Sequence, residues 1–180
     1  WLSLDAGERD PDQFVAYLTA SLRSISADLG DGALALAQAR PRPEGPADLP
    51  PGKALPLAGE GAQMIGTAAQ LASYSDIILT ILTNAEAIES VYLGKDGLLS
   101  GDVRGKLFVE MSTVRPATEQ AIAERTRKMG AAFIDCPVGG SVGPTSQGTL
   151  LGFAGGDAKD VERALPVLKQ LCRRIEHLGP

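Results

Sequence analysis

The chain has 180 residues, of which 44% are hydrophobic and 22% are charged, and a formal net charge of -5, values typical of a soluble globular domain with a substantial core. The acidic balance and the lack of a basic patch argue against nucleic acid as a partner. No apolar run approaches the roughly 18 residues that span a membrane, and the N-terminus shows no export signal, so we expect a cytoplasmic protein with no membrane partner.

The first forty residues are predicted to form a short, mostly helical segment. Residues 1–4 alternate large apolar and small polar side chains like the end of a strand, and apolar spacing then predicts helices over 11–27 and 32–39. Five prolines follow within eleven residues, which no helix or central strand tolerates. We therefore predict a proline-rich linker over 41–51 and a separate domain over 52–180.

Beyond the linker, strands and helices alternate. The expected strands are 62–65, 77–82, 106–111, 132–134 and 149–154, with a closing strand over 174–178. The expected helices are 68–73, 85–91, 160–171 and one that begins at Pro116 and ends at Gly130, with Thr67 and Asn84 as N-caps. This alternation predicts an α/β fold, a parallel sheet with flanking helices.

The cysteine and histidine content argues against a zinc site and a disulfide framework. Cys136 and Cys172 lie far apart in the sequence, and His177 is the single histidine. We therefore expect two free thiols and no metal.

Polar side chains follow three of the predicted strands at their carboxyl ends. Thr83 and Asn84 follow one strand, Ser112 and Thr113 follow the next, and a loop rich in glycine follows Asp135. Ligands of an open α/β sheet bind beyond the carboxyl ends of its strands, where short hydroxyl and amide groups can bond a nucleotide. Each position alone is better explained as a helix N-cap, whereas the three together favour a site.

A resemblance to the β-hydroxyacid dehydrogenase family rests on the segment VEMSTVRPATEQAIAERTRKMGAAFIDCPVGGSVGPTSQGTLLGFAGG. The family includes the 3-hydroxyisobutyrate dehydrogenases, is related to 6-phosphogluconate dehydrogenase, and shows S-T-[VI]-x-P, then G-x-x-F-x-D-A-P-V-S-G-G, then G-x-L and a Gly-Gly pair. The matching residues are Ser112, Thr113, Val114, Pro116, Gly130, Phe133, Asp135, Pro137, Val138, Gly140, Gly148, Leu150, Gly155 and Gly156. The similarity covers about 52–180, because GEGAQMIGTAAQLASYSDIILTIL also resembles the family.

The resemblance implies a Rossmann-type domain that binds NAD or NADP in an oxidoreductase of short 3-hydroxy acids. The coenzyme-binding residues that it implies are Leu82, Thr83, Ser112 and Thr113. Of these, Thr83 and Thr113 are expected near the nicotinamide ribose.

The resemblance also assigns the substrate carboxylate to the loop of Gly139, Gly140 and Ser141. The serine of the family pattern is Gly139 here, and the second glycine of the pattern is Ser141. Binding by backbone N–H groups survives this exchange, whereas the hydroxyl has moved by two positions.

Two parts of a complete family member are not found in the sequence. The G-x-G-x-x-G turn after a first strand is absent, since Gly30 and Gly32 lie between two predicted helices. The family's catalytic lysine lies on a helix beyond the last strand, where this chain stops at Pro180, and Lys159 and Lys169 are interpreted as surface charges. We therefore expect an incomplete Rossmann-type sheet, no catalytic residue in this chain and no activity of the chain alone.

The N-terminal residues resemble a different family. WLSLDAGERDPDQFVAYLTASLRSISADLGDGALALAQARPRP, within residues 1–45, is similar to part of the ATPase domain of MalT-like, LuxR-family transcriptional regulators. That piece carries neither a Walker A loop nor a DNA-binding helix-turn-helix. The chain is therefore predicted to join two unrelated pieces near 46–51.

A non-catalytic interaction or regulatory module built on the Rossmann remnant is the alternative function. The first strand of a Rossmann order is central, so its loss is expected to expose the 77–82 strand along one edge. Either residues 1–4 pair with that edge, or the chain forms homo-oligomers or aggregates. A function of the ATPase-regulator kind ranks last, because the chain lacks the nucleotide and DNA elements of those proteins.

Overall fold

The structure, a computed structural model, describes residues 67–180. The predictions for the N-terminal helices, the linker and the strand over 62–65 lie outside these residues. The described elements, in chain order, are α3 (Ala68–Tyr74), β1 (Ile77–Thr80), α4 (Ala85–Leu93), the 3-10 helix η2 (Leu98–Ser100), β2 (Leu107–Glu110), α5 (Pro116–Lys128), β3 (Ala132–Asp135), β4 (Val138–Gly139), α6 (Val142–Ser146), β5 (Leu150–Gly155), α7 (Ala158–Leu171) and β6 (Cys172–Gly179). No helix among them has the length and apolar character to cross a membrane.

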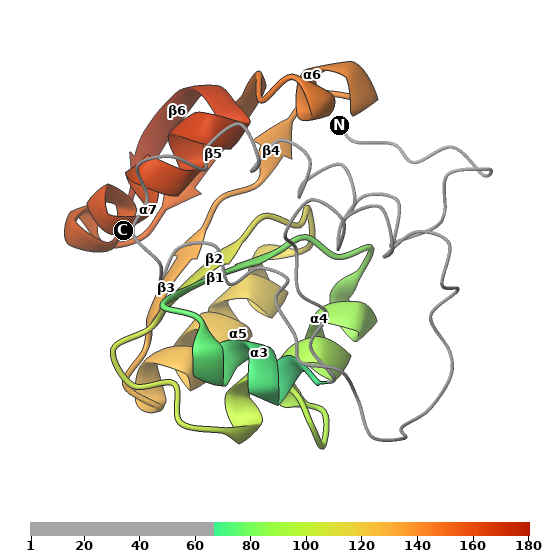
Figure 1. The fold of residues 1–180 in the computed structure, drawn as a ribbon, viewed down its shortest axis with the longest axis vertical. Helices are drawn as coiled ribbons and strands as arrows, with labels where there is room; N and C mark the ends of the chain where they lie inside the picture. Colours follow the sequence, from blue (N-terminus) through green and yellow to red (C-terminus); the bar gives the residue numbers. More distant parts are fainter. Residues whose placement is uncertain (1–66) are drawn as a thin grey trace.

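The described strands form one mostly parallel sheet with helices on both faces. β1, β2 and β3 are parallel neighbours in the order in which they occur in the chain. β5 runs antiparallel to β3 and β4 on one side, and pairs in parallel with β6 on the other. Figure 1 shows α3, α4 and α5 below the sheet and α7 above it. The predicted α/β fold with flanking helices is confirmed.

The antiparallel pairing of β5 differs from the parallel sheet expected from the sequence. The connection from β4 to β5, residues 140–149, is shorter than the roughly twelve residues that a parallel crossover needs. The stretch expected to be an irregular loop also contains β4 and α6. At the other end of the sheet, β1 stops at Thr80, so Ile81 and Leu82 of the predicted strand have left the sheet.

The hydrophobic core has two layers, one on each face of the sheet. Side chains alternate along a strand, so neighbouring residues of β2 enter different layers. Phe108 packs with Ile88 and Tyr92 on the α4 side, whereas Val109 packs with Leu168 on the α7 side. Because both faces are covered, the central strands are continuous apolar runs, which is why the sequence reveals them.

The predicted helix boundaries have their expected local chemistry. The Thr67 hydroxyl accepts the Gln70 N–H at 3.2 Å, and the side chain of Asn84 accepts the Ala87 N–H at 2.8 Å, so both residues are N-caps. Pro116 opens α5, and Gly130 follows its end with φ +81°, a conformation that glycine adopts at low cost.

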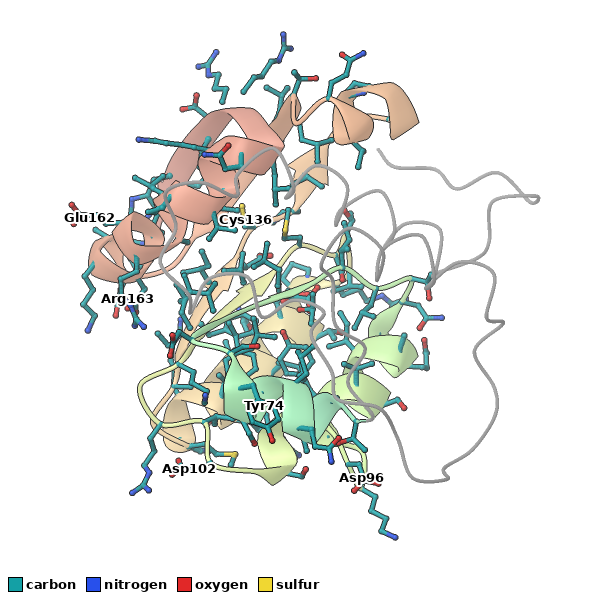
Figure 2. All side chains as sticks on the ribbon, in the orientation of Figure 1. Tyr74, Asp96, Asp102, Cys136, Glu162 and Arg163 are labelled. Carbon is teal, nitrogen blue, oxygen red and sulfur yellow. The ribbon has the colours of Figure 1, made fainter. Side chains whose placement is uncertain are left out.

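Both cysteines are buried free thiols, as the sequence predicted. Cys136 follows the end of β3 and Cys172 opens β6, and a Cβ on Gly152 of β5 would be 3.3 Å from the sulfur of Cys172 and 3.4 Å from that of Cys136. Burial raises the pKa of Cys136 to about 12 and that of Cys172 to about 11. Figure 2 shows Cys136 in the interior, whereas Asp102 and Glu162 lie at the surface.

We expect Gly148→Ala to destabilise the chain by about 3 kcal/mol or more, because two penalties add. Gly148 has φ +64°, and a Cβ at this position would lie 2.3 Å from the backbone oxygen of Gln170. Gly105→Ala is the matched control, because Gly105 has φ +75° but no atom within 4 Å of its Cβ position. That control is expected to cost about 1 kcal/mol, and chemical denaturation of both variants measures the difference. Equal losses would contradict a steric role for Gln170.

Candidate functional site

Three polar side chains form a row across the carboxyl ends of the parallel strands. Thr80, Glu110 and Asp135 are the last residues of β1, β2 and β3, and the strand pairing holds them in register. They lie two positions beyond the core residues that face α4 and α5, so their side chains point to that same face. Glu110, in the middle of the row, is completely buried.

Thr80 and Tyr92 form a chain of hydrogen bonds that ends on Glu110. The Thr80 hydroxyl donates to Oε2 of Glu110 over 2.5 Å and lies 2.7 Å from the Tyr92 hydroxyl on α4. A hydroxyl has one proton, so Thr80, which donates its own to Glu110, accepts that of Tyr92. The chain therefore connects α4 and β1 to one oxygen of the carboxylate.

Ser112 donates two hydrogen bonds to the other oxygen of the Glu110 carboxyl group. Its backbone N–H donates to Oε1 of Glu110 over 2.8 Å, and its hydroxyl donates to the same oxygen. The Ser112 Oγ also accepts the backbone N–H of Leu82, 2.6 Å away. Glu110 and Ser112 thus join the loop after β2 to the loop after β1.

Glu110 is a buried carboxyl group held by neutral donors. No Lys or Arg forms an ion pair with it within residues 67–180. Burial raises the pKa of Glu110, and hydrogen bonds from Ser112 and Thr80 oppose that rise. Because Ser112 and Thr80 direct donors at both oxygens, the network is complete only when Glu110 is ionised.

Three other buried carboxyl oxygens near Glu110 lack hydrogen-bond partners within the described residues. Both carboxyl oxygens of Glu119, in the first turn of α5, and Oδ1 of Asp135 are buried without a partner. Burial and, secondly, the Glu110 charge raise the pKa of Glu119 to about 8 and that of Asp135 to about 6. Glu119 therefore carries a proton at neutral pH. These groups do not form a metal site, since the described residues contain no cluster of three or more suitable ligands.

The structure divides the expected coenzyme-binding residues into two kinds. Leu82 and Ser112 meet through the hydrogen bond described above, and Ser112 is buried. Thr83 and Thr113 are exposed at the same edge of the sheet, where their hydroxyl groups can face a ligand. Asn84 acts as a helix N-cap, which is the role that the sequence indicated for this position when considered alone. The coenzyme contacts themselves stay a prediction.

The expected substrate loop lies beyond β3, at the carboxyl edge shared with the other two loops. Gly139 belongs to β4, and Gly140 has φ +154°, with Leu150 only 2.5 Å from the position of a Cβ. Ser141 is exposed and precedes α6, and its carbonyl accepts the N–H and the hydroxyl of Thr145 at 3.0 and 2.8 Å. Carboxylate binding by this loop also stays a prediction.

The sequence did not reveal Glu110, Tyr92 and Glu119 as parts of the site. The signal for Glu110 is its place as the single charged residue at the end of the apolar run 107–110, beside a strand end rich in hydroxyl groups. Tyr92 and Glu119 carry no comparable signal, because each matches an ordinary helix position.

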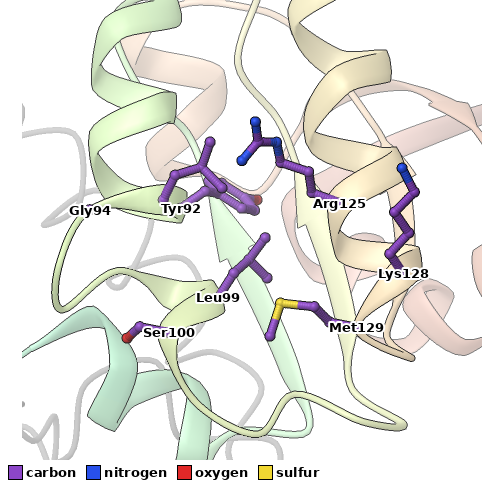
Figure 3. A pocket seen from close by; sticks show the side chains of 8 residues that line it. Tyr92, Gly94, Leu99, Ser100, Arg125, Lys128 and Met129 are labelled. Carbon is purple, nitrogen blue, oxygen red and sulfur yellow. The ribbon is translucent and has the colours of Figure 1, made fainter.

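A surface cavity of about 310 Å³ lies away from this edge. The residues that line it include Leu99 in η2, Met129 after α5 and two cations of α5, Arg125 and Lys128 (Figure 3). The C-terminal ends of α4 and α5 border the cavity, and these ends lead back to the amino ends of the strands. Thr80, Glu110 and Asp135 do not line the cavity, but Tyr92, whose hydroxyl is bonded to Thr80, does.

Comparisons with known proteins identify relatives of residues 47–179. A family model described as the NAD binding domain of 6-phosphogluconate dehydrogenase matches this range. The 3-hydroxyisobutyrate dehydrogenase of Pseudomonas aeruginosa is 37% identical over 132 residues, 73% of this chain and 44% of that protein. The NAD-dependent L-serine dehydrogenase of the same species is 34% identical over 124 residues, 69% of this chain and 42% of that protein. The chain thus spans less than half the length of these relatives.

A solved structure with the same fold is the 3-hydroxyisobutyrate dehydrogenase of Mycobacterium tuberculosis with L-serine. Its TM-score is 0.71 at 23% sequence identity, and the match covers 91% of this chain and 50% of that one. At this identity the likeness shows the fold alone. These comparisons give no support to the LuxR-family resemblance expected for residues 1–45.

We expect Glu119→Gln to stabilise the chain increasingly as the pH rises from about 4.5 to about 8. The folded pKa of Glu119 is above the ordinary glutamate value of 4.5, so the folded state binds more protons in this window and loses stability as the pH rises. The neutral glutamine removes this loss, which amounts to about 2–4 kcal/mol at the upper end.

Denaturant midpoints of both proteins across this pH window measure the effect. Glu124→Gln is the control on the same helix, because Glu124 is exposed and pairs with Lys128 at 2.6 Å, which lowers its pKa. If the stability of the Glu119→Gln variant depends on pH as that of the wild-type chain does, Glu119 is not protonated in the folded chain at neutral pH.

Proposed function

We propose that this chain, which belongs to the β-hydroxyacid dehydrogenase family through its NAD binding domain, is the coenzyme-binding part of an oxidoreductase of short 3-hydroxy acids. The match of a family model over residues 47–179 is the observation that carries the proposal. The coenzyme is NAD or NADP.

The nicotinamide end of the coenzyme is proposed to lie on the loops after β1 and β2. Thr83 and Thr113 are exposed there, and the hydrogen bond between Leu82 and Ser112 holds the two loops together. Hydroxyl groups at this position can bond the ribose, since each can both donate and accept.

The substrate is proposed to be a short 3-hydroxy acid whose carboxylate lies on Gly139, Gly140 and Ser141. 3-Hydroxyisobutyrate dehydrogenase, the relative from Pseudomonas aeruginosa, is named for an acid of this class. Backbone N–H groups of a glycine-rich loop suit a carboxylate, and Ser141 adds an exposed hydroxyl.

In the complete enzyme, bound coenzyme supplies a hydride acceptor. The C–H bond of the hydroxyl-bearing carbon breaks with both electrons, the hydroxyl proton passes to a base, and a carbonyl group forms. The lysine that serves as this base in the family has no counterpart assigned in the sequence, and Lys159 and Lys169 are exposed on α7. We therefore propose that the residues of this chain bind and orient the coenzyme and the substrate.

No observation favours the alternative of a non-catalytic module. The sheet order places β1 at an end of the described sheet, as the alternative expected, but this order equally fits a domain of the enzyme. Self-association into a homo-oligomer stays a prediction. Two buried free thiols fit a reducing compartment, which supports a cytoplasmic location.

Reduced nicotinamide mononucleotide, the half of the coenzyme proposed to meet these loops, tests the function on the chain itself. We expect backbone amide shifts in residues 82–84 and 112–114 in NMR titrations, with a dissociation constant of about 1–10 mM. Thr113→Val should weaken binding about three- to tenfold, because it removes one hydrogen bond.

Ser90→Ala is the matched control, because Ser90 is an exposed hydroxyl on α4 that the proposal does not use. Shifts confined to the cavity beside Met129 and Arg125, or no shifts at all, would contradict the proposed function.

A further inference from the structure

We infer that Glu110 is a positioning residue that fixes the spacing of the two coenzyme loops by holding the Ser112 hydroxyl toward the Leu82 N–H. The inference rests on the proposed function, because these loops are the ones assigned to the coenzyme. Its structural part can be tested without any ligand.

The two loops need a link beyond the end of the sheet. The last backbone bond between β1 and the residue after β2 runs from the Met111 N–H to the Thr80 carbonyl, at 2.7 Å. Beyond that point, the bond from the Leu82 N–H to the Ser112 Oγ is the one that joins the two loops within the described residues. The spacing of the loops therefore depends on where the Ser112 hydroxyl lies.

Glu110 determines the position of that hydroxyl. Its Oε1 accepts both the N–H and the hydroxyl of Ser112, so the Ser112 side chain is fixed at two atoms. With the hydroxyl proton directed at Glu110, a lone pair of the Ser112 Oγ is left for Leu82. The carboxylate therefore imposes the acceptor role that Leu82 requires.

Core packing alone does not account for a carboxylate at this place. An apolar side chain would fill the buried position without the cost of desolvating a charge. Unlike an apolar side chain, Glu110 can accept hydrogen bonds. One of its oxygens accepts from Ser112 and the other accepts from Thr80. Thr80 lies in β1, whereas Ser112 lies in the loop after β2. Substitutions can therefore separate the hydrogen bond of Glu110 to the sheet from its hydrogen bonds to the loop.

Hydrogen exchange of the Leu82 amide is the test, measured by NMR relative to the core amides of Val109 and Ile134. We expect Glu110→Met to speed Leu82 exchange about tenfold or more beyond any change in the core, because the orientation of Ser112 is lost. Glu110→Gln should restore most of the protection, because its amide oxygen can still face Ser112.

Thr80→Val is the matched control. It removes the bond to Oε2 and lowers overall stability, but it leaves the link from Leu82 to Ser112 intact. Equal Leu82 exchange in the Glu110→Met and Thr80→Val variants, each corrected for the core, would overturn the inference.

The wild-type chain gives a second measurement that does not depend on the folding of a variant. We expect the Ser112 hydroxyl proton to be visible by NMR through slow exchange with water, with a cross-peak to the Leu82 amide. A Ser112 hydroxyl that exchanges as fast as the exposed hydroxyl of Ser90 would overturn the inference.

Titration with reduced nicotinamide mononucleotide distinguishes a failure of the positioning role of Glu110 from a failure of the proposed function. If the wild-type chain shows a protected Leu82 amide but no ligand shifts, the positioning role stands and the proposed function fails. If Glu110→Met binds this ligand as tightly as the wild-type chain, the positioning role fails and the proposed function stands. A loss of about tenfold in the variant supports both.

Discussion

The site depends on the register of three parallel strands. Pairing of β1, β2 and β3 brings their last residues into one row, and the same pairing aligns the aromatic and aliphatic side chains behind them. A shift of β2 by one residue would turn Glu110 toward α7 and move Phe108 out of its layer. Core packing and the position of the carboxylate are therefore fixed by one set of backbone bonds, so the site cannot vary independently of the core.

Much of the fold could be predicted from the sequence because its signals are local. The strands at the centre of the sheet are apolar runs bounded by polar turns, and Pro116 and Gly130 mark the two ends of α5. Strand direction has no such signal, since an apolar run packs equally well in either direction. The antiparallel β5 follows from the length of its connection, which can be interpreted only once β4 is known to be a strand.

The candidate site could be predicted only in part, because sequence signals are local and the site joins residues that are distant in the sequence. Ser112 stood out because hydroxyl groups after a strand are typical of ligand edges, but its interaction with Leu82 requires two strands distant in sequence to be neighbours. Glu119 resembles a solvent-facing residue of a polar helix, but it is buried close to Glu110 and Asp135 at the strand ends. Long-range placement, rather than residue type, makes these carboxyls unusual.

The absence of a side chain at Gly152 couples three positions of the sequence. The sulfur atoms of Cys136, after β3, and of Cys172, in β6, approach the place of the missing Cβ, so the three residues share one small volume. A methyl group at 152 would require the neighbouring sulfur atoms to move by a few tenths of an ångström. The sizes of the side chains at these three positions are therefore coupled, and the two buried thiols fill space there.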